Sequence, residues 1–303
     1  MIEVEGLKKK FGENDALSGI DLRVDSNIIF AIVGPDGAGK TTLLRILAGI
    51  MTPDEGKVNI LGQDMVRNPE AAKRYTGYLS QRFSLNPTLT VAENIDFFGT
   101  LYEVPGDEKN KRLKRLLEFS RLGLFKDRQA GRLSGGMKQK LALCCALIHT
   151  PRILLLDEPT TGVDPISRRE LWEILYDLLS QGVLILVSTP YMDEAERAGE
   201  ILMIHEGKTL AQGNMEKLKS NYQHRLYEAV CGDNRRAFGL LSERIGNERV
   251  MFFGDKLHLA LQSEQESQTV RDLLEDSGLT VKSLVPISPG LEDLFMQELH
   301  FEK

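Results

Sequence analysis

The sequence predicts an α/β fold with a mostly parallel sheet, a helical subdomain and a small C-terminal α+β domain. Short apolar runs alternate with helical segments over residues 1–66 and 151–213, as is typical of a parallel sheet. The residues from about 85 to 150 keep a helical pattern, and after Gly213 short strand-like pieces return between helices. We therefore expect one domain over residues 1–215, with its helical subdomain at about 85–150, and an accessory domain over residues 220–303.

A glycine-rich loop joins the first buried strand to a helix. The strand is the apolar run 28–33, and residues 42–48 have helical periodicity. The loop has the spacing G-x-x-x-x-G-K-T and comprises Gly34, Pro35, Asp36, Gly37, Ala38, Gly39, Lys40, Thr41 and Thr42. Its glycines let several backbone N–H groups point into one concavity, at the positive end of the helix. The sequence thus predicts a P-loop NTPase core, with Lys40 on the β- and γ-phosphates and Thr41 on Mg²⁺.

A second buried strand ends in two carboxylates. The run 153–156 is followed directly by Asp157 and Glu158. In an open α/β sheet, the carboxyl ends of the strands face the ligand. We expect Asp157 to hold Mg²⁺ through water and Glu158 to polarise an attacking water. An acidic turn is the alternative interpretation, and the P-loop in the same chain favours the catalytic one.

The remaining elements follow from the same patterns. Residues 57–61, 183–188 and 201–205 are predicted strands, and 167–180 is a predicted helix. Beyond residue 220 we expect strands at 225–230, 257–261 and 281–285, and helices at 237–245 and 265–277. A helix with Leu113, Leu116 and Leu117 on one face carries the basic run Lys111, Arg112, Lys114 and Arg115. That run is more typical of a solvated face than of a binding patch.

A Ser-Gly-Gly sequence opens another helix and forms a second potential anion cradle. It consists of Ser134, Gly135 and Gly136, within the string Leu133–Gln139. One nucleotide needs only one cradle. A head-to-tail dimer, in which this loop covers the γ-phosphate held by the partner's P-loop, would use both. A plain helix N-cap is the alternative interpretation.

Composition limits the class of protein. The chain has 303 residues, an apolar share of 42% and a formal net charge of −6, so we expect no nucleic-acid partner. Cys144, Cys145 and Cys231 form no C-x-x-C pair, which favours core roles in a reduced cytoplasmic setting over metal ligation. We also expect no secretory signal, and no run approaches the ~20 apolar residues of a membrane span. If a membrane is involved, another chain would cross it.

With these motifs in order, residues 1–215 resemble the ABC ATPase family of transporter nucleotide-binding subunits. The resemblance implies an ATPase that uses ATP and Mg²⁺ and works as a homo- or heterodimer. It matches Phe11 to the aromatic residue that stacks on adenine, and Gln81 to the glutamine that senses Mg²⁺ and the attacking water. It also makes residues 34–42 the Walker A loop, Leu133–Gln139 the signature, Asp157 and Glu158 the Walker B carboxylates, and Asp164 part of the D-loop at the dimer interface.

The segment Pro289–Phe295 is similar to the C-terminal "S-L-E-D-x-F" segment of drug- and antibiotic-type ABC exporters, as are Gln81–Leu85 and Tyr191–Glu196. These ATPases work beneath separate membrane-spanning permease chains. The resemblance therefore implies a peripheral place on the inner face of the cell membrane. It makes the loop Arg82–Glu93 part of the permease docking surface.

One position departs from the family pattern. The family has a histidine after the strand 183–188 that contacts the γ-phosphate, and this chain has Pro190 there. Proline has no imidazole and no N–H. Four alternatives follow: a slow homodimeric ATPase, the degenerate half of a heterodimer that completes a competent partner site, a module that holds ATP without turnover, or a soluble ABC ATPase outside transport.

Overall fold

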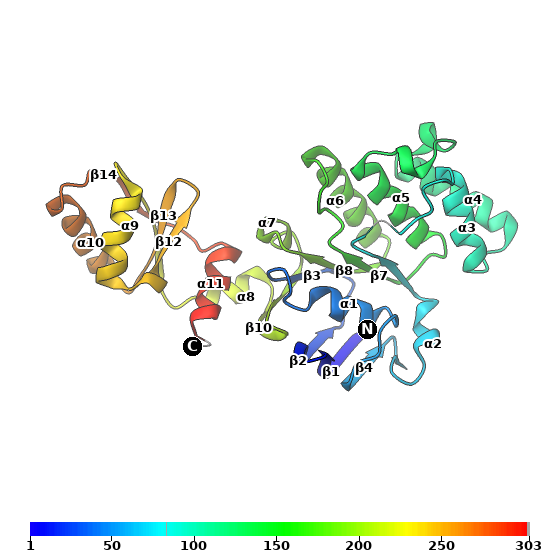
Figure 1. The fold of residues 1–303 in the computed structure, drawn as a ribbon, viewed down its shortest axis with the longest axis horizontal. Helices are drawn as coiled ribbons and strands as arrows, with labels where there is room; N and C mark the ends of the chain where they lie inside the picture. Colours follow the sequence, from blue (N-terminus) through cyan, green and yellow to red (C-terminus); the bar gives the residue numbers. More distant parts are fainter. Residues whose placement is uncertain (83, 302–303) are drawn as a thin grey trace. The chain divides into compact units, whose positions relative to one another are not determined.

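The computed structural model describes residues 1–82 and 84–301, which form two compact units. The first unit spans Met1–Met215 and the second begins at Glu216 (Figure 1). Each unit has its own sheets and its own buried core.

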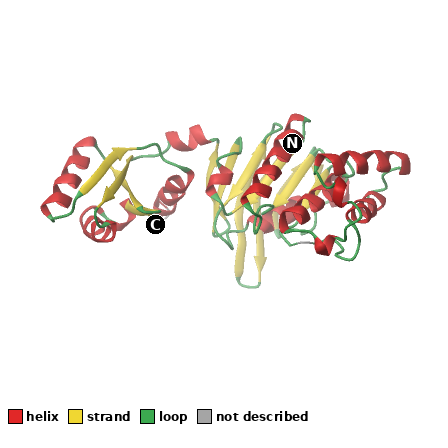
Figure 2. Ribbon diagram, turned by 90° about the horizontal axis from the view of Figure 1, so that it is seen from above, coloured by secondary structure: helices red, strands yellow, loops and turns green. Residues whose placement is uncertain are grey.

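A six-stranded sheet is the centre of the first unit (Figure 2). Its strand order is β10-β9-β3-β8-β7-β6, and every pairing is parallel except that of β10 with β9. The strands are β3 (Ile29–Val33), β6 (Thr76–Leu79), β7 (Ile153–Asp157), β8 (Leu184–Thr189), β9 (Glu200–His205) and β10 (Lys208–Gly213). All residues of β3, β7 and β8 are buried, as expected for central strands of a covered parallel sheet. The predicted α/β fold class is confirmed.

A four-stranded antiparallel sheet packs against one face of the parallel sheet. Its order is β2-β1-β4-β5, with β1 (Ile2–Phe11), β2 (Asn14–Val24), β4 (Glu55–Ile60) and β5 (Gln63–Asp64). Apolar residues of β1, β2 and β4 share one buried cluster with α1 (Lys40–Leu47) and with alternate residues of β3. This second sheet brings the end of β1 beside the glycine-rich loop.

Helices occupy the interval in which the sequence predicts a helical pattern. They are α3 (Val91–Leu101), α4 (Gly106–Phe119) and α5 (Gly135–Leu147). Thr90 and Glu93 form a reciprocal capping box that fixes where α3 begins. The other α-helices of the unit are α2 (Pro69–Lys73), α6 (Pro165–Ser180) and α7 (Met192–Ala195), and α8 (Met215–Ser220) begins at its last residue.

The second unit is a β-α-β-β-α-β arrangement followed by one more helix. Its antiparallel sheet has the order β12-β13-β11-β14, with β11 (Arg225–Cys231), β12 (Val250–Phe253), β13 (Lys256–Leu261) and β14 (Val281–Pro286). Helices α9 (Asn234–Ile245) and α10 (Glu264–Asp276) share its apolar core. In α11 (Leu291–Phe301), the buried carboxylate of Asp293 accepts from the Gly290 N–H at 2.9 Å and pairs with His258 Nδ1 at 2.7 Å.

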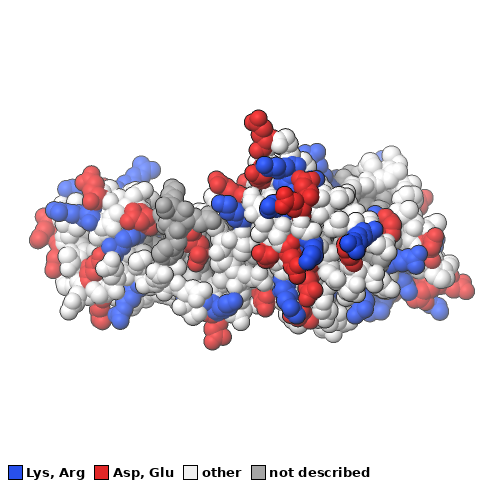
Figure 3. Space-filling view, turned by 90° about the horizontal axis from the view of Figure 1, so that it is seen from below, with Lys and Arg blue, Asp and Glu red and all other residues white. Residues whose placement is uncertain are grey.

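No helix within the described residues is long and apolar enough to cross a bilayer. On the face drawn in Figure 3, Lys and Arg side chains are interspersed with Asp and Glu. The three cysteines are buried and unpaired, and burial raises the pKa of the Cys144 thiol to about 11.

Candidate active site

The glycine-rich loop lies between β3 and α1. Two of its glycines are required because other backbone segments pass too close to them to leave room for a side chain. Gly39 has φ = 106°, a left-handed conformation that L side chains rarely adopt. A Cβ there would lie 2.4 Å from the Ala16 carbonyl oxygen, and one at Gly34 would lie 2.1 Å from that of Ile204. A larger residue at either position would push the loop off the core, so the loop's shape depends on these two glycines.

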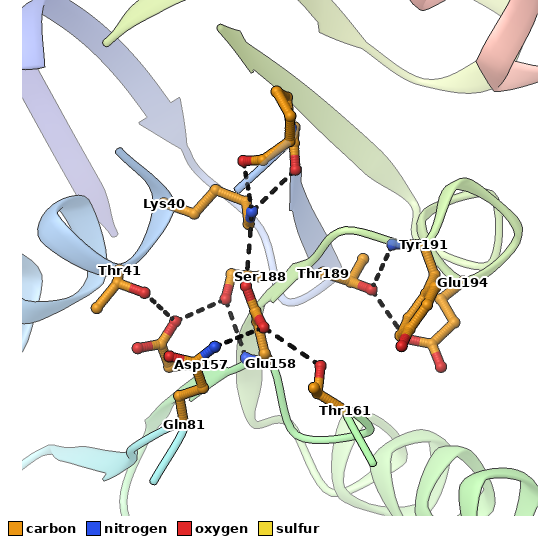
Figure 4. Close-up of polar contacts among 12 residues, drawn as sticks. Lys40, Thr41, Gln81, Asp157, Glu158, Thr161, Ser188, Thr189, Tyr191 and Glu194 are labelled. Atoms are coloured by element: carbon orange, nitrogen blue, oxygen red, sulfur yellow. Dashed lines mark hydrogen bonds and ion pairs between the residues drawn. The ribbon is translucent and has the colours of Figure 1, made fainter. Parts of the chain in front are cut away.

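Lys40 lies inside the loop and is only 4% exposed (Figure 4). Its Nζ donates to the carbonyl oxygens of Gly34 at 2.8 Å and Pro35 at 3.0 Å. Glu158 Oε1 lies 3.5 Å from the same ammonium. A buried ammonium with carbonyl and carboxylate partners is a fixed positive charge, which suits a group that binds phosphate oxygens.

Asp157 ends β7 and is fully buried at the carboxyl edge of the sheet. Its Oδ1 accepts from Thr41 Oγ1 at 3.0 Å and from Ser188 Oγ at 2.9 Å. Tyr78 OH donates to Oδ2 at 3.3 Å, and burial followed by the Asp157 charge raises the pKa of Tyr78 to about 12. The phenol is therefore a neutral donor at physiological pH. A hydroxyl and a carboxylate facing each other are hard oxygen ligands, so the residues fit Mg²⁺.

Glu158 follows β7 in a left-handed backbone conformation, with φ = 48°. Its N–H donates to Ser188 Oγ at 3.0 Å, which fixes the backbone against β8. Its Oε2 accepts from Gln81 Nε2 at 2.8 Å and from Thr161 Oγ1 at 3.2 Å. Figure 4 shows the carboxylate between these two donors and Lys40. A non-glycine residue in this conformation is uncommon and is often found at functional sites.

Lys40, Thr41 and Glu158 line one cavity of about 350 Å³. Of the residues singled out from the sequence, those that line it are Phe11, Asp36, Gly37, Ala38, Gly39, Lys40, Thr41, Thr42, Gln81 and Glu158. Phe11 is 49% exposed, and Asn14 and Ala16 of β2 lie on the same cavity wall. An aromatic face near a cationic, N–H-lined loop suits a base joined to a phosphate chain. Within the described residues, no histidine lines the cavity.

The Ser-Gly-Gly segment and Asp164 lie outside this cavity. Ser134 caps α5, and Asp164 caps α6 by accepting from the N–H groups of Ile166 and Ser167. These hydrogen bonds, chiefly that from Ser167, lower the pKa of the Asp164 carboxyl. A Cβ at Gly136 would lie 2.4 Å from the Ser167 side chain, so the two helix starts lie side by side. Ser134, Gly135 and Asp164 are exposed, which makes this edge available to a second molecule.

The segment containing Pro190 is anchored by a buried glutamate. Glu194 is 1% exposed, and its Oε2 accepts from Thr160 Oγ1 at 2.7 Å and Thr189 Oγ1 at 3.0 Å. Its Oε1 lies 3.3 Å from Arg168 Nε. Figure 4 shows Thr189, Tyr191 and Glu194 of this segment to one side of Glu158. The chain around Pro190 is thus fixed in place although it carries no imidazole.

Sequence reasoning missed four residues of this site: Tyr78, Thr161, Ser188 and Glu194. Ser188 is the last residue of a predicted strand, 183–188, that ends at the same edge as Asp157, so the shared edge of parallel strands was an available signal. Tyr78 lies three residues before Gln81, and Thr161 lies three residues before Asp164. Nothing in the sequence indicates that they contact the carboxylates.

Comparison with known proteins identifies the class. A family model for ABC transporters matches residues 17–161, and one for the C-terminal domain of DrrA1-3-like ATP-binding proteins matches residues 213–299. The probable multidrug ABC transporter ATP-binding protein YbhF of Escherichia coli (strain K12) is 40% identical over 99% of this chain and 52% of its own length. The chain therefore spans about half of that relative.

Two further relatives cover more of their own length. The Nod factor export ATP-binding protein I of Ralstonia nicotianae is 35% identical over 98% of this chain and 93% of that protein. An ATP-binding cassette solved as a dimer with ADP and Pi in a post-hydrolysis state has a TM-score of 0.66 and 28% identity, over 71% of this chain and 99% of that one. The chain belongs to the ABC transporter ATP-binding family. It combines an ABC ATPase domain with a DrrA-like C-terminal domain.

Proposed function

We propose that this chain binds and hydrolyses ATP to power export through separate membrane-spanning permease subunits. One observation carries the proposal: Lys40, Thr41, Gln81 and Glu158 line one cavity, and Asp157 lies directly behind Thr41. This is the set of groups that phosphoryl transfer to water needs. The names of the exporter relatives support the transport role.

Each residue has a role that its position supports. Lys40 and the loop N–H groups bind the β- and γ-phosphates, and Phe11 stacks on the base. Thr41, Asp157 and Gln81 would hold Mg²⁺, which neutralises phosphate charge when it is bound. Glu158 accepts the proton of the attacking water. Ser134, Gly135, Gly136 and Asp164 act across the interface of an ATPase dimer, where the exposed edge meets the partner's nucleotide.

Thr161 takes on a positioning role for Glu158 in this proposal. Lys40 and Gln81, the other side-chain partners of that carboxylate, are both assigned to the nucleotide and its metal. The hydroxyl of Thr161 is the partner of Glu158 that has no assigned contact with the nucleotide or the metal ion. It therefore orients Glu158 when the site is loaded, in a chain where Pro190 supplies no imidazole.

Binding of ATP is the direct test. We expect Lys40→Ala to weaken ATP affinity by about 10- to 100-fold, because hydrogen bonds to charged groups contribute about 1.5–3 kcal/mol. Equilibrium titration with a fluorescent ATP analogue measures it. Lys111→Ala, a change of the same kind at an exposed residue of α4 outside the cavity, is the control and should stay within twofold. Equal affinity of the Lys40 variant and the wild type would contradict the nucleotide site.

A second surface supports the permease partner. Leu89, Ala92, Phe97 and Leu113 line an open groove of about 440 Å³ on α3 and its surroundings. Phe97 is 55% exposed, and Leu101 on the same helix is 62% exposed. The groove adjoins the loop Arg82–Glu93 that the family resemblance implicates, of which Phe83 lies outside the described residues. We assign the groove to an amphipathic cytoplasmic segment of the permease, which would hold the chain at the inner membrane face.

Docking has its own prediction. We expect Phe97→Asp to abolish co-purification with membrane-spanning subunits, because it replaces the largest apolar side chain of the groove by a third carboxylate beside Glu93 and Asp96. ATP affinity should not change. Ile50→Asp, at a residue 59% exposed elsewhere on the unit, is the matched control. Retention of the partner by the Phe97 variant at wild-type levels would move the docking surface elsewhere.

Pro190 favours a second candidate, in which this chain is the ATP-holding half of a heterodimer. Its signature edge would complete a competent partner site, while its own P-loop site turns over slowly. The retained Glu158, with its donors Gln81 and Thr161, instead supports hydrolysis in this chain's own site.

A further inference from the structure

We propose that a cavity at the amino ends of β7 and β8 binds a small amphipathic anion, such as a medium-chain organic carboxylate. The cavity is bounded by Pro151 and Arg152 before β7, Gly182 and Val183 before β8, and the helix α4. The nucleotide cavity lies at the carboxyl ends of the same strands, beside Asp157 and Ser188. The proposed site is therefore separate from the one already described, and it stands independently of the proposed function.

The floor of the cavity is apolar. Leu116 of α4, Leu147 of α5 and Leu178 of α6 line it and are 9%, 6% and 6% exposed. Phe119 and Val183 add further apolar surface. The volume is about 330 Å³, within the range of roughly 300–1,000 Å³ that is typical of small-molecule sites. An apolar ligand body of ten or so heavy atoms would be shielded from water there.

Three arginines line the same cavity. Arg112 pairs with Glu108 at 3.0 Å and donates to the Ile148 carbonyl oxygen at 3.1 Å. Arg115 donates to Gln181 Oε1 at 2.9 Å, which is a neutral partner. Within the described chain, the Arg152 guanidinium has no hydrogen bond or ion pair. None of the described residues that line the cavity is acidic. Two positive charges therefore face it without a counter-charge.

The sequence predicts that the basic run of α4 is a solvated face, and the structure shows that part of the run also lines the cavity. Lys111 and Lys114 are exposed, in agreement with a solvated face. Arg112 and Arg115 also line the cavity, together with Arg152 from a segment far along the chain, although Arg115 and Arg152 are exposed and Arg112 is partly buried. The two arginines of the run therefore border both solvent and the cavity, whereas the two lysines do not line the cavity.

The chemistry of the lining selects the ligand. A guanidinium binds carboxylate, sulfonate or phosphate oxygens with two parallel N–H groups, more specifically than an ammonium does. The apolar floor favours an attached hydrocarbon or aromatic body over a bare inorganic ion. A ligand held by Arg115 and Arg152 would join α4 to the base of the sheet.

Isothermal titration of the full chain with decanoate, without nucleotide, tests the proposal. We expect saturable binding of one decanoate per chain, and binding at least tenfold weaker for decanol, which has the same body without the charge. The double variant Arg115→Gln/Arg152→Gln should also bind at least tenfold more weakly, because two charge-assisted contacts are lost. The matched control is Lys111→Gln/Lys114→Gln, which removes two charges from the solvated face of the same helix. It should stay within twofold.

Several results would overturn the proposal. They are no saturable binding of decanoate, equal affinity for decanol, or equal losses in the two double variants. Binding only to vesicles of anionic phospholipid, with none of free decanoate, would also overturn it, because it would indicate a membrane-contact surface. All four exchanged residues have exposed or partly exposed polar ends, so folding should persist, and thermal melting checks this. Because the titration requires no ATP, its failure would leave the proposed function untouched.

Discussion

Replacing Glu158 by glutamine is expected to lower kcat for ATP hydrolysis by about 10²–10⁴-fold, the contribution typical of a positioned general base. The amide cannot accept the proton of the attacking water. It keeps the side-chain shape, so the contacts with Gln81 and Thr161 can still form. ATP affinity should remain within a few-fold of wild type. In the proposed function the ATPase dimer opens after hydrolysis, so we expect an ATP-bound dimer of the variant to accumulate. Steady-state turnover and size-exclusion chromatography with light scattering measure the two effects.

The variant Thr161→Val gives a graded comparison. It removes one hydrogen bond to the Glu158 carboxylate at nearly constant volume, so kcat should fall by about 10- to 100-fold, equivalent to about 1.5–3 kcal/mol for a hydrogen bond to a charged group. The KM for ATP should not change, and Thr161→Ser should restore most of the rate.

If Glu158→Gln hydrolyses like wild type, or ATP leaves its monomer–dimer equilibrium unchanged, Glu158 is not the base of an ATP-driven clamp.

The second large effect is expected from Pro190→His. If the missing imidazole limits turnover, the histidine should raise kcat by about 10²–10³-fold, the scale of one positioned polar contact to a transition state. The flanking residues favour a gain without rearrangement, because Glu194 holds Thr189 and the Tyr191 N–H donates to Thr189 Oγ1 at 3.1 Å. The measurement is steady-state Mg·ATP hydrolysis by the purified wild type and variant.

The wild-type rate decides between the two dimer models. A nearly inert wild type with an active Pro190→His variant indicates a degenerate site, and a second ATPase chain should then be sought. A wild type that already hydrolyses well, with little change in the variant, indicates a self-sufficient homodimer. Pro190→Ala is the control: it removes the ring without adding an imidazole and should not activate. Activation by alanine would show that proline rigidity, not the missing side chain, limits the rate.

The sequence by itself determined the local features of this protein. The strand, the glycine-rich loop and the helix follow one another within about twenty residues. The need for residues without a side chain at Gly34 and Gly39 can therefore be recognised from the sequence. Buried strands such as β3 and β7 appear as short apolar runs because both of their faces are covered. The family motifs then indicated Phe11 and Gln81, which by composition alone are uninformative. Both line the same cavity as Lys40 and Glu158.

The tertiary structure decided which side chains meet. The order β9-β3-β8-β7 brings Ser188 to Asp157, and nothing in the sequence states that order. Thr41 and Asp157 are 116 residues apart, and their contact depends on two strands ending at one edge. The same holds for Arg115 and Arg152, which belong to a helix and a strand entry. Periodicity reports how each element is buried, whereas long-range contacts depend on how the elements pack, and that packing is a property of the whole chain.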